Sequence, residues 1–448
     1  MTSARKHLVE LLSVEDPFTF ERSYLEPLQL AAAQEMFSER RARIPVLDNL
    51  AKEAGISEVR QLSDLVPLLL SHTTYKSYPQ SFIQKGQWDR LSMWLGMVSA
   101  RRYEDVDVKG VRDIDEWIDR MWKADCYVVS SSGTGGKVAL FPKSKSDQDR
   151  FREVVRRFRG WPNSVKPERK HHFFLFGSMK GPYSAAVAAG YAAEAFGRPD
   201  STHVLMDEPV LISKVSRMAE MRQKMKDGTA TPGELAAFEA EANARSKESQ
   251  RRMDEMVERL INVRKEPVYV MGTAAQVYEI VERGRALGVA EGEFHPDSFV
   301  MTTGGTKHFK LPEDYRTQIS RFFWRARSGA GYGMTEMSCS YPRCEAGRYH
   351  ANPFTVPLLL DETGTELLNA PDGIVEGRFA FLDLATDLRW GGLITADKVK
   401  VDFSGKCGCG RKSIGVLDPI LRYDEGVGSD KIQCSGTIDA YIRGSFAD

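Results

Sequence analysis

This chain of 448 residues contains few cysteines and has no excess of either positive or negative charge. Its six cysteines are too few for a disulfide scaffold, and reduced thiols suit the cytosol. Lysine and arginine together number 62, as do aspartate and glutamate, so the formal net charge is zero. This balance argues against a protein that binds nucleic acid, or an anionic membrane surface, through its bulk charge.

Long hydrophobic runs are missing as well. The apolar stretch from Leu8 to Leu12 is interrupted by Glu10, whereas a signal peptide needs about 7–15 unbroken apolar residues. The runs at 173–177 and 356–360 stop far short of the roughly 20 residues that cross a membrane. We therefore expect a soluble, cytoplasmic protein with no membrane partner.

The chain does contain an alternation of helical and strand patterns that predicts an α/β protein. Residues 1–125 have a mainly helical composition, and Pro45 divides two helical segments within 28–55. Residues 126–340 alternate β-branched runs with helices, which is typical of parallel sheets, whereas 341–448 are rich in short strands. We expect these three regions as the domains, the last of them a smaller β-rich subdomain.

The most charged part of the middle region, 211–264, predicts a helical hairpin. Its second helix begins with Thr231 as N-cap, Pro232 in the first turn and Glu234 completing a capping box. A solvated hairpin is the simpler interpretation, and a lid or a homodimer contact is the alternative. The other elements expected in this region are strands at 171–177, 267–273 and 297–305, and helices at 145–161, 184–197 and 274–287.

The first motif with chemical meaning is a loop of small residues within 126–141, between two β-branched runs. Hydroxyl groups supply donors, glycines let backbone N–H groups approach an anion, and a lysine supplies positive charge. A polyphosphate needs these groups, although a tight turn also explains such a loop. Its residues are Ser130, Ser131, Ser132, Gly133, Thr134, Gly135, Gly136 and Lys137, a spacing that differs from that of the nucleoside-triphosphatase P-loop.

A second motif, Tyr332-Gly333-Met334-Thr335-Glu336, is followed by Asp397 in the sequence Thr-Ala-Asp. The tyrosine offers a ring that can stack on a base, and the threonine offers a hydroxyl for a phosphate. The glutamate offers a carboxylate for Mg²⁺, which prefers oxygen ligands. The carboxylate of Asp397 can accept both hydroxyls of a ribose.

These motifs in this order resemble the adenylate-forming superfamily of acyl-CoA synthetases, nonribosomal peptide adenylation domains and luciferases. The resemblance covers roughly residues 125–440. It implies the N-terminal region of that superfamily, with parallel α/β subdomains and a smaller β-rich subdomain, and it implies ATP and Mg²⁺ as ligands. Gly135 stands where threonine is usual and Val138 where proline is frequent, and neither change removes a needed donor.

Carried over residue by residue, the resemblance assigns a role to each position. It implies catalytic roles for Thr335, Glu336 and Lys137, with Glu336 holding Mg²⁺. For the acid pocket it implies Phe176, Ser178, Tyr183 and Met334, and aromatic rings there suit an aryl acid. The nucleotide-binding residues that it implies are Ser131, Ser132, Gly133, Thr134, Gly135, Gly136, Gly304, Gly305, Tyr332, Gly333, Asp397 and Arg422.

A third constellation, Cys407-Gly408-Cys409-Gly410-Arg411, places two thiols on a glycine-rich turn, where both can reach one Zn²⁺. Cys344 and His350 are the best candidates for the remaining ligands, and four ordinary buried side chains are the alternative. Within the superfamily this pattern resembles the phenylacetate–CoA ligase branch. A site whose four ligands all come from the protein is structural.

Near the end of the chain, Asp430-Lys431-Ile432 followed by Gly436 resembles the hinge that precedes the superfamily's mobile C-terminal domain. We expect that domain and its catalytic lysine to be absent, which makes acyl-protein synthetases and short stand-alone adenylating enzymes closer parallels. Lys137, Lys307 or Arg422 would then compensate for the lysine.

The expected reaction joins a carboxylic acid, an aryl acid by preference, to AMP with release of pyrophosphate. The acyl group then passes to an amine, hydroxyl or thiol acceptor, which is a small molecule, CoA or a carrier or partner protein, as in natural-product biosynthesis. Alternatives are a CoA ligase or acyl-protein synthetase for a fatty acid and, in another class, a degenerate zinc-stabilised scaffold. The presence of Thr335, Glu336 and Asp397 favours the enzyme, and the lack of a G-x-S-x-G elbow disfavours a hydrolase.

Overall fold

The computed structural model describes residues 3–131, 137–162, 165–303, 311–368 and 373–423. The chain divides into two compact units, each of which combines segments far apart in the sequence. Unit 1 contains the described residues of Met1–Val129, Ala139–Val154 and Gly331–Ser429, and unit 2 those of Ser130–Val138 and Val155–Ala330. The helical N-terminal region and the β-rich C-terminal region therefore belong to the same unit.

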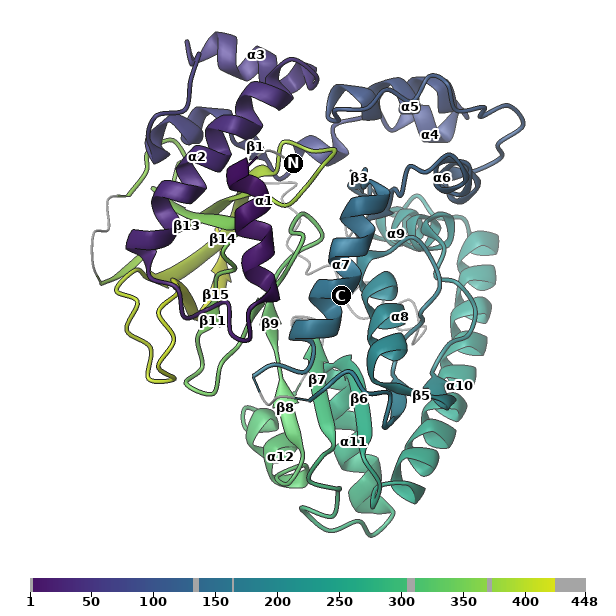
Figure 1. The fold of residues 1–448 in the computed structure, drawn as a ribbon. Coiled ribbons are helices and arrows are strands. Elements are labelled where there is room, and N and C mark those ends of the chain that lie inside the picture. Colours follow the sequence, from purple (N-terminus) through teal and green to yellow (C-terminus); the bar gives the residue numbers. More distant parts are fainter. Residues whose placement is uncertain (1–2, 132–136, 163–164, 304–310, 369–372, 424–448) are drawn as a thin grey trace. The chain divides into compact units, whose positions relative to one another are not determined.

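Unit 1 is built around a mainly antiparallel sheet with the order β11-β15-β14-β13-β12 (Figure 1). The short strand β1 adds to β14 in parallel, and β9 and β10 form a separate antiparallel pair. Every residue of β12 is buried, which explains its unbroken apolar sequence. The strands are β1 (Leu70–Ser71), β9 (Gly331–Tyr332), β10 (Tyr341–Pro342), β11 (Tyr349–His350), β12 (Thr355–Leu360), β13 (Ile374–Asp383), β14 (Gly392–Asp402) and β15 (Gly415–Arg422).

Among the helices from the N-terminal part of the chain, α2 packs against this sheet. The Gln29 side chain on α2 donates to the carbonyl oxygens of Pro353 and Thr355, at 2.8 and 3.1 Å, and so fixes α2 at the start of β12. Pro45 begins a new helix, as the sequence predicts. The helices are α1 (Ser3–Glu10), η1 (Leu11–Ser13), α2 (Arg22–Arg41), α3 (Pro45–Glu53), η2 (Leu62–Leu68), η3 (Thr74–Lys76), α4 (Ser81–Gln84), α5 (Trp88–Met97) and α6 (Ile114–Lys123).

Unit 2 is built around a five-stranded sheet with the order β5-β4-β6-β7-β8, in which every pair is parallel. Tyr269 on β6 anchors its core, with its ring 5.2 Å from that of Phe173 and 4.9 Å from that of Phe196. The elements are β4 (His171–Leu175), α8 (Ser184–Phe196), β5 (Gly197–Val204), β6 (Val268–Thr273), α11 (Ala274–Ala286), β7 (Phe299–Thr303), α12 (Tyr315–Phe322) and β8 (Arg327–Gly329).

The order of this sheet reverses at β4. The chain passes from β4 to β5 on one side, and then crosses back to β6 on the other side of β4. Ligands of open α/β sheets bind beyond the carboxyl ends of the strands at such a switch point. Residues 176–178, after β4, and Thr273, at the end of β6, lie at this point.

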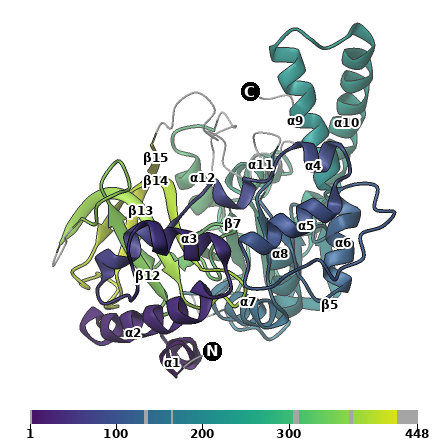
Figure 2. The ribbon, with the colours of Figure 1, turned by 90° about the horizontal axis from the view of Figure 1, so that it is seen from above.

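The charged region of unit 2 forms the predicted hairpin of α9 (Ile212–Lys226) and α10 (Pro232–Asn262). Figure 2 shows the two helices running side by side. Thr231 and Glu234 form the capping box that the sequence predicts: the Thr231 hydroxyl accepts from the Glu234 N–H, and the Glu234 carboxylate accepts from the Thr231 N–H.

The predicted α/β class is confirmed, with a parallel sheet and a β-rich part. Two further strands, β2 (Val129–Ser130) and β3 (Leu140–Phe141), flank the loop of small residues, and α7 (Lys145–Phe158) follows. The sequence did not predict β5, which contains Pro199 and polar residues, because it is an edge strand and partly exposed. No helix among the described residues is long and apolar enough to span a membrane.

Candidate active site and candidate metal centre

Asp397 is the centre of a hydrogen-bonded group within unit 1. It lies on β14 and is buried, and its Oδ2 accepts a hydrogen bond from the Tyr332 hydroxyl at 2.8 Å. Its Oδ1 accepts one from Arg422 Nε at 3.2 Å, because Arg422 on β15 stands opposite Asp397 in the sheet register. Two residues to which the resemblance assigns nucleotide binding, Tyr332 and Arg422, therefore both bind a third, Asp397.

The Tyr332 ring is buried in an aromatic cluster. Its centroid lies 5.5 Å from that of Phe379, and the two rings meet edge to face. Burial, and next the Asp397 carboxylate, raise the pKa of Tyr332 well above its ordinary value. The hydroxyl therefore stays protonated and donates to Asp397, which fixes the orientation of that carboxylate.

The turn after β9 carries Met334, Thr335 and Glu336, all of them partly exposed. It approaches a neighbouring segment so closely at Gly333 that a Cβ there would lie 2.6 Å from the Cβ of Ser340. Partial shielding of the Glu336 carboxylate from water raises its pKa, and the positive charge of Arg389 opposes this rise. A carboxylate in such surroundings gains stability from a bound cation.

Two buried charged side chains hold the backbone of this turn. Arg389 Nη1 donates to the carbonyl oxygen of Glu336 at 2.9 Å. The Asp383 Oδ2 atom accepts from the Ser338 N–H at 2.5 Å. Both side chains are 1% exposed, so the backbone is held at Glu336 and again two residues later by groups shielded from water.

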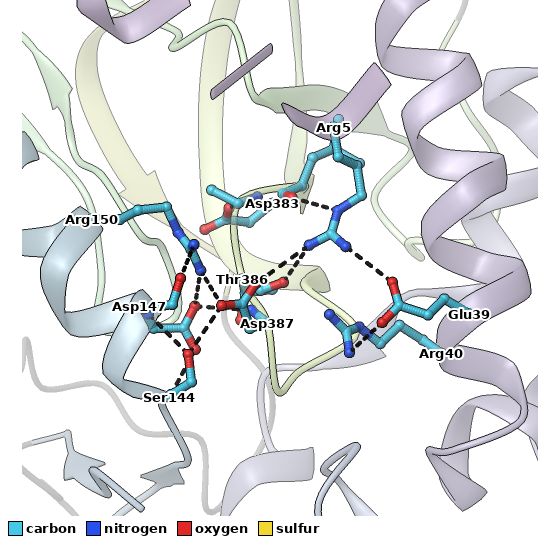
Figure 3. A network of polar contacts seen from close by, with 12 residues as sticks. Arg5, Glu39, Arg40, Ser144, Asp147, Arg150, Asp383, Thr386 and Asp387 are labelled. Carbon is cyan, nitrogen blue, oxygen red and sulfur yellow. Dashed lines mark hydrogen bonds and ion pairs between the residues drawn. The ribbon is translucent and has the colours of Figure 1, made fainter. Parts of the chain in front are cut away.

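The loop that carries Asp383 and Arg389 is anchored in turn by α1 (Figure 3). Arg5 is buried and donates to the carbonyl oxygens of Leu384 and Thr386, at 3.0 and 2.8 Å. Its third partner is Glu39 on α2, at 3.3 Å. The first helix of the chain thus fixes a loop that lies hundreds of residues later in the sequence.

The same loop is anchored from α7 (Figure 3). The Arg150 guanidinium lies 2.8 Å from Asp147 Oδ1 and 2.7 Å from Asp387 Oδ2. Ser144 and Asp147 form a capping box at the start of α7, with reciprocal bonds of 2.9 and 3.0 Å between the side chain of each and the N–H of the other. The backbone that precedes α7 is therefore also fixed.

Lys143 lies in this backbone segment and is 3% exposed. Its Nζ lies 4.7 Å from the centroid of the Phe151 ring. Burial, and next the charge of Arg389, lower the pKa of Lys143 to about 8, although the charges of Asp147, Asp383 and Glu336 oppose the shift. A buried amine with a perturbed pKa, within electrostatic reach of a candidate metal ligand, is a frequent feature of functional sites.

The remaining predicted site residues belong mainly to unit 2. Phe176 and Tyr183 are each 2% exposed, and the Ser178 hydroxyl donates to the Glu208 carbonyl oxygen at 2.9 Å. Ser131 and Lys137 are partly exposed. The other predicted positions lie outside the described residues: Ser132, Gly133, Thr134, Gly135, Gly136, Gly304, Gly305, Lys307, the segment 430–432 and Gly436.

A candidate metal centre lies elsewhere in unit 1. The ligand atoms of Cys344, His350, Cys407 and Cys409 all lie within 4.8 Å of one another. The Cys344 and Cys407 sulfurs are 3.7 Å apart, and the Cys409 sulfur is 3.4 Å from His350 Nε2. Tetrahedral Zn²⁺ with Zn–S bonds of about 2.3 Å separates two sulfurs by about 3.8 Å. The four residues therefore fit a tetrahedral zinc ion.

The surroundings of His350 also fit a metal ligand. The residue is fully buried, and burial lowers its pKa to about 4, so the ring is neutral at pH 7. Its Nδ1 lies 2.9 Å from the Ser413 hydroxyl, which leaves Nε2 facing Cys409. Metal-bound histidines have such a partner on the second ring nitrogen, because it fixes the ring's orientation.

The structure is similar to solved structures of 2-hydroxyisobutyryl-CoA ligase. The open conformation of that ligase, in complex with 2-HIB-AMP and CoA, aligns with a TM-score of 0.53 and 13% identity, over 91% of this chain and 77% of that chain. The thioesterification state aligns with a TM-score of 0.54 and 13% identity, over 91% and 70%. This chain shares the fold of that ligase. No protein-family model and no curated protein sequence matches it.

The fold brings together residues that the sequence did not single out. Arg389, Asp383 and Lys143 surround the turn of Glu336, although none belongs to a recognisable motif. A weak signal exists in the run Phe141-Pro142-Lys143, where a lysine directly follows an apolar strand. Its burial depends on contacts with distant segments, which the sequence pattern does not reveal.

Proposed function

We propose that this protein activates a carboxylic acid with ATP, forming an acyl-adenylate and pyrophosphate. One observation carries the proposal. Tyr332, Asp397 and Arg422 form one hydrogen-bonded group in unit 1, and the turn that follows Tyr332 carries Thr335 and Glu336. The likeness in fold to a ligase solved with an acyl-AMP supports this interpretation.

In the proposed reaction a carboxylate oxygen of the acid attacks the α-phosphorus of ATP. A new P–O bond forms, the bond between the α- and β-phosphates breaks, and pyrophosphate leaves with that electron pair. Such a reaction requires in-line positioning and neutralisation of the developing charge, and it needs no covalent protein nucleophile.

In our proposal, each residue of the site in unit 1 has a separate role in this reaction. The Asp397 carboxylate, oriented by Tyr332 and Arg422, accepts hydrogen bonds from ribose hydroxyls. Thr335 donates to a phosphate oxygen, and Glu336 is the ligand that would hold Mg²⁺. When bound, Mg²⁺ neutralises the charge of the phosphates. Ser131 and Lys137, with the loop between them, are proposed to bind the phosphates as well.

For the acid, we propose an aryl carboxylate. Phe176, Ser178 and Tyr183 follow β4 in the sequence, and residues 176–178 lie at the switch point of the parallel sheet of unit 2. Phe176 and Tyr183 supply aromatic surface there, and flat aromatic substrates pack well on such side chains. We propose that the acyl group then passes to CoA, to an amine or hydroxyl of a small molecule, or to a carrier protein.

The test is acid-dependent exchange of labelled pyrophosphate into ATP, measured across a panel of aryl and aliphatic acids without an acceptor. The proposal predicts exchange with aryl acids. Exchange with aliphatic acids alone would support adenylation as the reaction but contradict the assignment of an aryl substrate. If no acid supports exchange and ATP does not raise the melting temperature, the protein is a binding or scaffold protein rather than this enzyme.

We also propose that Cys344, His350, Cys407 and Cys409 bind one structural Zn²⁺. The contacts of 3.7 Å and 3.4 Å within this group and the neutral His350 ring support the assignment. All four ligands are side chains of the protein, which is typical of structural rather than catalytic zinc. Elemental analysis of the purified protein should give about one zinc per chain.

A further inference from the structure

Lys143 differs from the other buried cations of unit 1. Arg5 and Arg389 are each held by carboxylates or carbonyl oxygens. Lys143 is as well buried as they are, at 3% exposed. Among the described residues its ammonium forms no salt bridge and no side-chain hydrogen bond, and the ring of Phe151 is the contact that it makes.

The backbone at Lys143 leaves little freedom to the base of this side chain. Lys143 and Tyr127 exchange both backbone hydrogen bonds, at 3.0 and 3.1 Å. Directly after it, the capping box of Ser144 and Asp147 starts α7. The ammonium is therefore carried on a rigid segment, as a preorganised binding group should be.

The charge of this ammonium lies within electrostatic reach of Glu336, Asp383 and Asp147, and of the cation Arg389. None of these carboxylates approaches the Lys143 ammonium closely enough to form an ion pair. Asp147 instead pairs with Arg150, and Asp383 accepts hydrogen bonds from backbone N–H groups. An ammonium buried without a close anionic partner costs free energy. A ligand that brings anionic oxygens to Glu336 would supply that partner.

We propose that Lys143 binds a phosphate oxygen of the nucleotide whose metal Glu336 holds. The inference rests on the proposed function, because that function places phosphates next to Glu336. It assigns phosphate binding to a residue between β3 and α7, beyond the loop of small residues to which the sequence assigns this role. A phosphate oxygen forms a charge-assisted hydrogen bond with an ammonium, one of the stronger polar contacts in proteins.

The test is a calorimetric titration of the full chain with adenosine, AMP and ATP in the presence of Mg²⁺, for the wild type and Lys143→Met. We expect the variant to bind ATP about ten- to a hundredfold more weakly and adenosine equally well, since the loss of a charged hydrogen bond has this size. The AMP arm shows whether the α-phosphate is the group that is bound. Lys145→Met is the matched control, because Lys145 lies two residues away, is exposed and should leave all three affinities unchanged.

Thermal unfolding separates a ligand-binding role from a structural one. Removing an unpaired buried ammonium should leave the melting temperature of the free protein unchanged or raise it, whereas a structural role predicts a fall. Lys143→Arg, which keeps the charge, should retain more ATP affinity than Lys143→Met. Equal ATP affinity in the wild type and Lys143→Met would overturn this inference alone, and a wild type that binds no ATP would overturn the proposed function with it.

Discussion

Unit 1 contains two clusters of polar side chains, and they differ in whether the polar groups find partners within their own cluster. In the cluster of Cys344, His350, Cys407 and Cys409, the four ligand atoms converge on one point, with Ser413 behind the histidine. Around Glu336, by contrast, the carboxylate has a raised pKa and Lys143 lacks an anionic partner among the described residues.

In our proposal, this difference separates a structural site from a functional one. A closed set of ligands stabilises the fold when its ion is bound and has no position left for a substrate. A cluster that keeps buried charges without close partners destabilises the folded protein, and a bound ligand that supplies the partners stabilises it. The two clusters should therefore respond in opposite ways to substitution.

The largest effect is expected for Glu336→Gln. We expect acid-dependent exchange to fall about a thousandfold, or about 4 kcal/mol, because a metal ligand is lost. Since partial shielding from water raises the pKa of Glu336, the charged carboxylate is disfavoured in the folded state, so the variant should melt at the same or a higher temperature. Glu345→Gln, at an exposed site on the same segment, is the control for exchange. Full activity in Glu336→Gln would remove the metal role.

Cys407→Ser is expected to have the opposite effect on stability. It should lose zinc and destabilise the protein by about 3 kcal/mol or more, because structural zinc binding contributes roughly 10–16 kcal/mol. Elemental analysis and thermal unfolding measure the two effects. Cys126→Ala, at a buried cysteine outside the cluster, should keep its zinc. A stable protein that is free of zinc would contradict the structural role.

Arg389→Lys tests whether Arg389 positions Glu336 without contacting the nucleotide itself. It removes the guanidinium bond to the Glu336 carbonyl oxygen, and we expect kcat/KM for ATP to fall about tenfold. Raising the Mg²⁺ concentration should restore part of the rate if the arginine positions the metal ligand. A defect that is independent of Mg²⁺ would show that Arg389 serves folding instead.

The affinity for ATP should also depend on pH through Lys143. The protonated amine binds phosphate, and its pKa is lowered to about 8, so affinity should be full below that pH and fall roughly tenfold between pH 7.5 and 9.5. The charged groups that face it are Arg389, Asp147, Asp383 and Glu336. Lys143→Arg stays charged throughout, so any pH dependence that remains in that variant belongs to these neighbours.

The smallest effect is expected for Tyr332→Phe. The variant keeps the aromatic cluster and removes the hydroxyl that donates to Asp397. With Arg422 still in place, we expect ATP affinity to fall about threefold, the size of one neutral-donor hydrogen bond. Isothermal titration measures this change. A hundredfold loss would mean that the tyrosine contacts the nucleotide itself.

Part of this molecule could be predicted from its sequence because the signals are local. The capping box of Thr231 and Glu234 marks a helix start within four residues, and the Cys-Gly-Cys spacing of Cys407 and Cys409 marks a turn whose two thiols lie close together. The order of the motifs around Tyr332 and Asp397 indicated the fold. In each case the meaning lies in a few neighbouring residue types.

The rest depends on contacts between distant segments. Lys143 looks like any lysine after a strand until the structure shows it buried, and Arg389 looks like a surface arginine until its bond to Glu336 is known. The loop that carries Arg389 is fixed by Arg5, more than three hundred residues earlier in the sequence. The edge strand β5 was missed for a related reason, since its pairing with β4 outweighs the weak strand propensity of its residues.

The central claim is that the cluster around Glu336 and Asp397 serves adenylation of a carboxylic acid. The most direct test uses the acid found by exchange, labelled with oxygen-18 in its carboxylate, with ATP and an acceptor. If the carboxylate attacks the α-phosphorus, one labelled oxygen remains on AMP after acyl transfer, and mass spectrometry should find labelled AMP and unlabelled pyrophosphate. Turnover that leaves AMP unlabelled would contradict the account.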